Sequence, residues 1–303
     1  MLDDRANTRT PIWGGDRLDL DAYLERVGFR GRVEPGIDTL RELQYAHVTT
    51  FPFENLDAFL RRPMSLDLDT LQDKMVRGRR GGYCFEQASL FAAVLERVGF
   101  SVTGLLGRVQ KGSTAVRPPT HAMLRVETAE SAADGRSWLC DAGFGEGQLA
   151  PIELADGATA ARGGWSYRLT RGAPVPGADG WLFHGLRGGE WFHLHSVTLD
   201  PRVPVDYTVA NHYVSTHPRS PFSGRLWVQR LGDGLLHQLD GTTLSAFQPD
   251  TPVGEMEWTR QIATSVVPEV LAEVFGIVLD EADAAAVVDR LAAQQREAAV
   301  SAA

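Results

Sequence analysis

The spacing of apolar side chains predicts a series of helices over roughly the first hundred residues. Apolar positions recur there at intervals of three and four, which places them on one face of a helix. The predicted helices cover residues 19–28, 38–48, 66–75 and 83–99. Asp19 or Asp21 can cap the first helix, and Asp38 can cap the second. The hexapeptide Leu-Glu-Arg-Val-Gly-Phe ends the first and the last helix, so we expect Gly28 and Gly99 to adopt the left-handed conformation of a C-terminal cap.

After residue 102 the pattern changes to short segments that are rich in aromatic residues and separated by glycine and aspartate. Some of these segments alternate between apolar and polar positions, which is typical of strands with one buried face. The predicted strands are 121–126, 137–140, 165–170, 181–186 and 191–197. Short strands in close succession favour a meander or a small barrel.

The last section, from about residue 211, mixes both patterns. Two apolar segments flank Gly232-Asp233-Gly234, which predicts a β-hairpin, and Asp240-Gly241 predicts a second turn. Helical spacing returns over 268–276 and 281–297. We therefore expect a helical part at residues 1–101, a β part at 102–210 and a mixed α/β part at 211–303.

Composition narrows the class of protein. The 303 residues are 43% hydrophobic, which is enough for packed cores. The 30 lysines and arginines stand against 39 aspartates and glutamates, and the resulting charge of −9 argues against a nucleic-acid partner. No apolar run is long enough for a membrane span, and the first eight residues contain no apolar signal segment. With only two cysteines, a disulfide framework is excluded, and we expect a cytoplasmic protein without membrane contact.

The segment Arg79-Arg80-Gly81-Gly82-Tyr83-Cys84-Phe85-Glu86-Gln87 carries the clearest chemical signal. It places Cys84 in the first turn of a predicted helix, where free N–H groups and the helix dipole favour a thiolate. The two preceding glycines would permit the close approach of a ligand. An isolated cysteine in an apolar helix is more often a core residue, but this context favours a nucleophile.

A cysteine nucleophile needs a base, and the base needs a group that orients it. His121 starts an alternating strand directly after Pro118-Pro119-Thr120, where it can face a cleft. Asp141 ends a short apolar strand, and a carboxylate in that place is costly unless it is paired. Either residue alone could be structural. We expect Cys140, next to Asp141, to point away from it into the core.

Three other patterns indicate little on their own. Alternating glycines at 143–147 suggest a nucleotide loop, but the fingerprint requires glycine where Gln148 stands. His193 and His195 could begin a metal site, yet no further ligands are close to them in the sequence, so we expect no metal. The arginines between residues 77 and 80 could attract an anionic cofactor or form a solvated helix end, and both interpretations stay open.

Together the motifs resemble the arylamine N-acetyltransferase family, in their order and near their spacing. The resemblance rests on Arg79–Glu86, Thr120-His121, Asp141-Ala142-Gly143-Phe144-Gly145, Phe51-Pro52-Phe53-Glu54-Asn55-Leu56, Val209-Ala210-Asn211 and Ser215-Thr216-His217-Pro218. These motifs span roughly residues 20–225. The resemblance implies an α+β protein with a helical bundle, a β-barrel and an α/β lid, in which the first two parts form a papain-like cysteine-enzyme core.

The same resemblance assigns roles to individual residues. Cys84 would be the nucleophile, His121 its base and Asp141 the residue that orients the base. The acceptor pocket would contain Phe53, Phe85, Phe144 and Val109, and the acetyl-CoA donor would lie near Thr120, Gly143 and Gly145; no metal is implied. One departure stands out, because the family usually has asparagine four residues after the cysteine and this chain has Ala88. The missing amide puts the rigidity of the neighbouring backbone in doubt.

The resemblance therefore predicts acetyl-CoA-dependent acetylation of aromatic amines and hydrazines by a ping-pong route through acetyl-cysteine. An aromatic amine suits such a route because its nitrogen is largely unprotonated at neutral pH. One alternative is an amide synthase of the same fold that acts on carrier-bound acyl chains. Two others are a cysteine hydrolase or transglutaminase-like enzyme, and a binding module without enzymatic activity.

Overall fold

The computed structural model describes residues 11–301, so the expectation about the first eight residues lies outside the described part. The helices are α1 (Leu20–Val27), α2 (Ile37–Thr50), α3 (Leu56–Phe59), α4 (Leu68–Leu71), α5 (Cys84–Val98), α6 (Ser131–Asp134), α7 (Pro204–Thr216), α8 (Val267–Glu273) and α9 (Glu281–Ser301). The strands are β1 (Phe53–Glu54), β2 (Ser101–Val109), β3 (His121–Glu127), β4 (Trp138–Cys140), β5 (Ile152–Glu153), β6 (Thr159–Arg162), β7 (Trp165–Gly172), β8 (Gly180–Arg187), β9 (Glu190–Val197), β10 (Trp227–Gly232), β11 (Leu235–Asp240), β12 (Thr243–Phe247) and β13 (Trp258–Gln261).

Eight antiparallel strands form the middle of the molecule, in the order β5-β4-β3-β2-β9-β8-β7-β6. Strand β5 at one edge also contacts β6 and β7 at the other, so the sheet curls into a nearly closed barrel. All five strands predicted between residues 121 and 197 are present in it. Strand β2 was not predicted, yet it lies in the centre of this sheet and pairs with β3 and β9.

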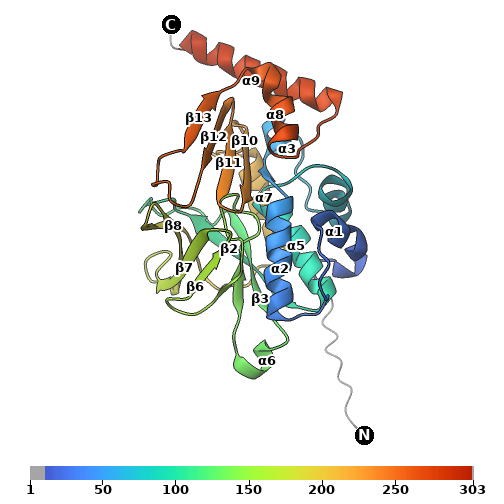
Figure 1. The fold of residues 1–303 in the computed structure, drawn as a ribbon, viewed down its shortest axis with the longest axis vertical. Coiled ribbons are helices and arrows are strands. Elements are labelled where there is room, and N and C mark those ends of the chain that lie inside the picture. Colours follow the sequence, from blue (N-terminus) through green and yellow to red (C-terminus); the bar gives the residue numbers. More distant parts are fainter. Residues whose placement is uncertain (1–10, 302–303) are drawn as a thin grey trace.

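Helices α1, α2 and α5 lie beside the barrel, as Figure 1 shows. One continuous apolar core joins this helical part to the barrel, and helix α5 is buried on nearly all sides within it. Asp19 caps α1 as predicted, accepting a hydrogen bond from the amide of Ala22 at 3.1 Å. The prediction for Asp38 was wrong, because α2 begins earlier and Gly36 occupies the cap position. Gly28 and Gly99 both have positive φ, which confirms the two predicted C-caps.

The third predicted helix is α-helical only over α4. It continues as a wider π-helical turn from Gln72 to Arg77. Turns of this kind are often found near functional sites. Here the turn carries the largely buried Lys74 toward three carboxylates, Glu54, Asp57 and Glu86.

A second antiparallel sheet, in the order β1-β10-β11-β12-β13, forms the lid (Figure 1). The hairpin predicted around Asp233 joins β10 to β11, and the turn at Asp240-Gly241 leads to β12. The two-residue strand β1 reaches this sheet from early in the chain, with Phe53 opposite Gln229. A separate apolar core lies between the sheet and helices α3, α8 and α9.

The observed architecture confirms the predicted α+β class with a helical part, a barrel and an α/β lid. The division at residues 101/102 and 210/211 stays a prediction. Helix α7 crosses the second of these positions, and β1 joins the first part to the lid sheet. Within residues 11–301, no helix is both long and apolar enough to cross a lipid bilayer.

Candidate active site

Cys84 is the first residue of helix α5 and lies in the wall of a cavity of about 750 Å³. Its side chain is only slightly exposed, and its Sγ atom lies 3.9 Å from the carbonyl oxygen of Thr120. The start of the helix is fixed by Glu86, whose carboxylate accepts a hydrogen bond from the amide of Tyr83 at 3.1 Å. The thiol therefore lies where the unpaired amides of a helix N-terminus favour negative charge.

His121 begins strand β3 and lies in the wall of the same cavity. Its Nε2 atom lies 2.7 Å from Oδ2 of Asp141, which directly follows strand β4, and both side chains are buried. Burial alone would lower the pKa of His121, but Asp141 and the Cys84 thiol raise it to about 10. Because Nε2 faces the carboxylate, Nδ1 is the nitrogen left to exchange a proton with Cys84.

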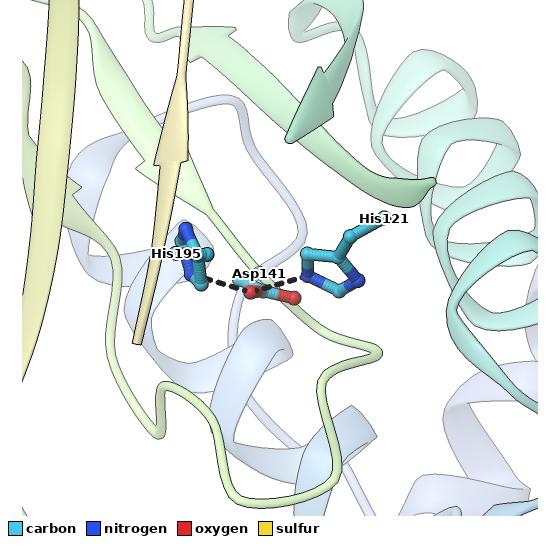
Figure 2. Close-up of side chains that lie close together, drawn as sticks. All are labelled: His121, Asp141 and His195. Carbon is cyan, nitrogen blue, oxygen red and sulfur yellow. Dashed lines mark hydrogen bonds and ion pairs between the residues drawn. The ribbon is translucent and has the colours of Figure 1, made fainter. Parts of the chain in front are cut away.

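Asp141 is held as an anion in a site without water contact. Burial favours its neutral form, but His121 and His195 hold the pKa of this carboxyl well below its usual range. Figure 2 shows the two imidazoles on opposite sides of the carboxylate. His195, from strand β9, has its Nε2 atom 3.1 Å from the same Oδ2 atom that His121 contacts.

The position of His195 beside this pair was not predicted from the sequence. Its spacing in the sequence paired His195 with His193 as a possible start of a metal site, and no further metal ligands were close to them in the sequence. The fold instead gathers His121, Asp141 and His195, with one potential ligand atom from each lying within 4.8 Å of the others. Both imidazoles approach one carboxylate oxygen at hydrogen-bond distances, so this arrangement suits proton exchange and orientation.

The cavity contains most of the pocket residues that the sequence predicts. Phe53, Val109, Phe144 and Thr120 line it together with Cys84 and His121. Other residues of the lining were not predicted from the sequence. They include Tyr213, Val214, Phe222, Trp227, Gln229 and four cations, Lys111, Arg117, Arg219 and Arg225. Several of them follow the motif Ser215–Pro218, which marked this segment without indicating that its side chains turn toward Cys84.

Besides Asp141, three predicted site residues lie outside the cavity lining. The ring of Phe85 is fully buried and packs against Tyr83 and Tyr207, at centroid distances of 5.8 and 5.6 Å. Gly143 lies directly against Cys84, since a Cβ atom on Gly143 would come within 2.7 Å of the Cα atom of Cys84. Gly145 packs against Phe53 and Gln229.

The two glycines before Cys84 serve the packing of the chain. A Cβ atom on Gly81 would overlap the carbonyl oxygen of Pro52, so the expected approach of a ligand is replaced by an approach of the protein backbone. The same region answers the doubt raised by Ala88. Gln87 donates hydrogen bonds to the carbonyls of Gly82 at 2.8 Å and Pro52 at 3.3 Å, so a neighbouring amide holds this backbone.

Comparison with known proteins decides the family. A family model described as N-acetyltransferase matches residues 36–284. The arylamine N-acetyltransferase of Mycolicibacterium smegmatis is 39% identical over 269 residues, covering 87% of this chain and 94% of that protein. The protein of the same name from Escherichia coli K12 is 34% identical over 276 residues, covering 90% of this chain and 94% of that protein. The chain belongs to the arylamine N-acetyltransferase family.

Solved structures of arylamine N-acetyltransferases share the fold, including the papain-like core. The Mycobacterium abscessus structure superposes with a TM-score of 0.87 at 43% identity and covers 94% of this chain and 98% of its own. A Mycobacterium marinum structure in complex with CoA has a TM-score of 0.79 at 30% identity, covering 90% of this chain and 98% of its own. The predicted fold and family are thus confirmed.

The arginines before Cys84 differ in role. Arg77 pairs with Asp73 at 2.7 Å on the exposed face, which agrees with a solvated helix end. Arg80 fits neither of the two interpretations, because it is largely buried and its Nε atom contacts Glu54 at 2.8 Å. Its guanidinium also lies 4.0 Å from Asp283 in α9, so the ion pairs link the lid to the segment before Cys84.

Proposed function

We propose that this protein acetylates aromatic amines and hydrazines by a ping-pong mechanism, with acetyl-CoA as donor and Cys84 as the residue that carries the acetyl group. The observation that supports this most is the arrangement around one cavity. Cys84 at the start of α5 and His121 share its wall, and Asp141 anchors His121 at 2.7 Å. The named activity of the relatives, and a family structure with bound CoA, point the same way.

In the first half-reaction the Cys84 thiolate attacks the carbonyl carbon of the acetyl thioester. The bond between that carbon and the CoA sulfur breaks, and the protonated His121 can supply the proton to the leaving thiolate. Asp141 stabilises the imidazolium and keeps Nδ1 directed toward the reacting sulfur. The products of this half-reaction are free CoA and acetyl-Cys84.

In the second half-reaction the amine nitrogen attacks the acetyl carbonyl, and the Cys84 thiolate leaves. His121 accepts the proton that the nitrogen loses, which restores the starting state. Aromatic and aliphatic side chains of the cavity, Phe53, Phe144 and Val109 among them, supply apolar contacts for a flat ring. An aromatic amine reaches this site uncharged, whereas an alkylamine would have to lose a proton first.

The cations of the cavity suit the phosphates of the donor. Arg225 is paired with Asp240 and Lys111 with Glu146. Within residues 11–301, Arg117 and Arg219 form no ion pair, so their guanidinium groups are available to an anionic ligand. We therefore assign the phosphates to the part of the cavity near Arg117 and Arg219, and the acetyl group to the part near Cys84 and Thr120.

Initial rates measured over a matrix of acetyl-CoA and aromatic amine concentrations test this proposal. A ping-pong mechanism gives parallel lines in double-reciprocal plots, and free CoA should form in one equivalent per enzyme before any amine is added. Intersecting lines, with no release of CoA in the absence of amine, would contradict the covalent route. A panel of amines, hydrazines and carrier-bound acyl substrates would then establish the acceptor class.

A further inference from the structure

His195 occupies an unusual place for a histidine that the proposed mechanism does not use. Its side chain is fully buried inside the barrel, and its Nε2 atom lies 3.1 Å from Oδ2 of Asp141. The ring stacks on Phe183 with a centroid distance of 4.6 Å and an interplanar angle of 7°. The ring of Phe144 packs against the His195 ring from another side, with a centroid distance of 5.3 Å. The ring is therefore fixed by its apolar neighbours and directed toward the carboxylate (Figure 2).

Burial leaves His195 with one polar partner. Neither of its ring nitrogens makes a well-aligned hydrogen bond within the described part of the chain, so the nearby Asp141 carboxylate is the group that can offset the cost of burying them. The titratable groups around it are Asp141 after β4, His121 on β3, His193 on its own strand and His184 on β8. Burial lowers the pKa of His195, and this outweighs the raising effect of Asp141. The ring is neutral, and an N–H on Nε2 is the tautomer that a carboxylate favours.

We infer that His195 is a positioning residue, which holds the Asp141 carboxylate from the side opposite His121 and thereby sets how firmly His121 is oriented toward Cys84. This inference rests on the proposed function, because it assigns His195 a role only through the proposed triad. A carboxylate that contacts two imidazoles through one oxygen has less freedom to rotate. A neutral N–H near that oxygen also stabilises the anion without competing for the proton on His121.

His195 acts on the acylation step rather than on substrate binding, because it does not line the cavity. Its loss should leave the affinity for substrates nearly unchanged. It should slow the formation of acetyl-Cys84 and the alkylation of Cys84 at low pH, since both depend on a well-placed imidazolium. Residues that orient a histidine through a second contact commonly affect function by about ten- to a hundredfold, and we expect a loss in that range.

Two substitutions of similar polarity separate positioning from packing. In His195→Gln the amide nitrogen can reach the place of Nε2, whereas in His195→Asn the shorter side chain leaves it closer to the place of Nδ1. His184→Gln is the matched control, because His184 lies on the neighbouring strand, is half-buried and makes its contact to Thr170 at 3.2 Å. For each variant we would measure thermal unfolding, the single-turnover rate of acetyl-Cys84 formation, and the rate of iodoacetamide labelling of Cys84 from pH 5 to 9.

We expect His195→Asn to lower the acetylation rate by about ten- to a hundredfold and to slow the labelling of Cys84 at low pH. His195→Gln should retain most of the wild-type acetylation rate and labelling rate. His184→Gln should change neither rate. If folded His195→Asn keeps the wild-type rate and pH profile, the inference is overturned. It is also overturned if both His195 variants slow equally with an unchanged pH profile, because a purely structural role would do that. Should the wild-type protein form no acetyl-Cys84 at all, the proposed function fails instead, and the two failures are distinguishable.

Discussion

At the scale of single residues, the two cysteines offer an internal comparison. Both are buried, but Cys84 lies in the wall of the cavity at a helix start, whereas Cys140 lies within strand β4. Burial and the adjacent Asp141 raise the pKa of the Cys140 thiol, so it stays protonated and inert. We expect Cys84→Ala to abolish acetyl transfer and Cys140→Ala to retain most of it. Steady-state rates of the two variants, with circular dichroism to confirm folding, check this; substantial turnover by Cys84→Ala would contradict a covalent role.

The raised pKa of His121 predicts how Cys84 reacts as the pH changes. A group whose pKa rises from 6.5 to about 10 on folding stays protonated through the neutral range, so His121 remains a cation beside Cys84 below pH 7. Alkylation of Cys84 should therefore remain fast at pH 6, and Asp141→Asn should slow it strongly because the imidazolium loses its counter-ion. Peptide mass spectrometry of labelled protein from pH 5 to 9 measures both. A wild-type rate that vanished below pH 8 would refute the ion pair.

The same pair also predicts a pH dependence of stability. Because the folded pKa of His121 exceeds its unfolded value, the pair contributes stability that is complete below about pH 6.5 and is lost as the pH rises toward about 10. The free energy of unfolding in urea should therefore fall over that window in the wild type. In Asp141→Asn this part of the decrease should be absent. An equal decrease in both proteins would show that other groups cause it.

Three residues of the site were predicted from the sequence, whereas the place of His195 was not, and the difference has a physical reason. Cys84, His121 and Asp141 stand in local motifs at the ends of elements, where a reactive side chain leaves a recognisable pattern. His195 joins them only because β9 pairs with β2 and places His195 opposite Val109, a contact between residues far apart in the sequence. Spacing along one strand suggested His193 as its partner instead. The periodicity of a sequence does not indicate which strands, far apart along the chain, will pair with each other.

At the scale of elements, the turn after β4 fits against the start of α5. A Cβ atom on Gly143 would lie 2.7 Å from Cα and 3.1 Å from the carbonyl oxygen of Cys84. Gly143→Ala should therefore displace Asp141 or Cys84, lowering kcat by at least about tenfold and stability by about 1–3 kcal/mol. Gly224→Ala is the matched control, since a Cβ atom there meets open space. Kinetics and thermal melts of both variants check this, and a Gly143→Ala protein with wild-type kcat would disprove the tight contact.

Elements with a clear local sequence signal were predicted, whereas very short or weakly patterned elements were not. Asp19, Gly28 and Gly99 mark helix ends through their own conformational preferences, so the sequence indicated those ends correctly. Strand β1 has only two residues and exists because it pairs with β10 across most of the chain. Helix α7 was also missed, since its exposed and buried positions show little amphipathic contrast.

At the scale of the whole molecule, a net charge of −9 coexists with four cations around one cavity. The overall negative charge argued against a nucleic-acid partner, but it did not indicate this local concentration of positive charge. If Arg117 and Arg219 contact the phosphates of acetyl-CoA, kcat/KM for the donor should fall steeply with added salt. A small neutral acetyl thioester without phosphates is the control, and its kcat/KM should change little. Equal salt dependence for the two donors would contradict the assignment of the phosphates.

In the proposed mechanism Cys84 carries the acetyl group between the two substrates, and mass spectrometry can detect this intermediate. The wild-type protein is mixed with acetyl-CoA in the absence of amine, quenched in acid, and digested to locate the modification. We expect one added acetyl group, on Cys84. It should disappear when an aromatic amine is supplied, with the acetylated amine formed in equal amount. A protein that acetylates the amine without ever showing acetyl-Cys84, or that carries the acetyl group on another residue, would contradict the proposed mechanism.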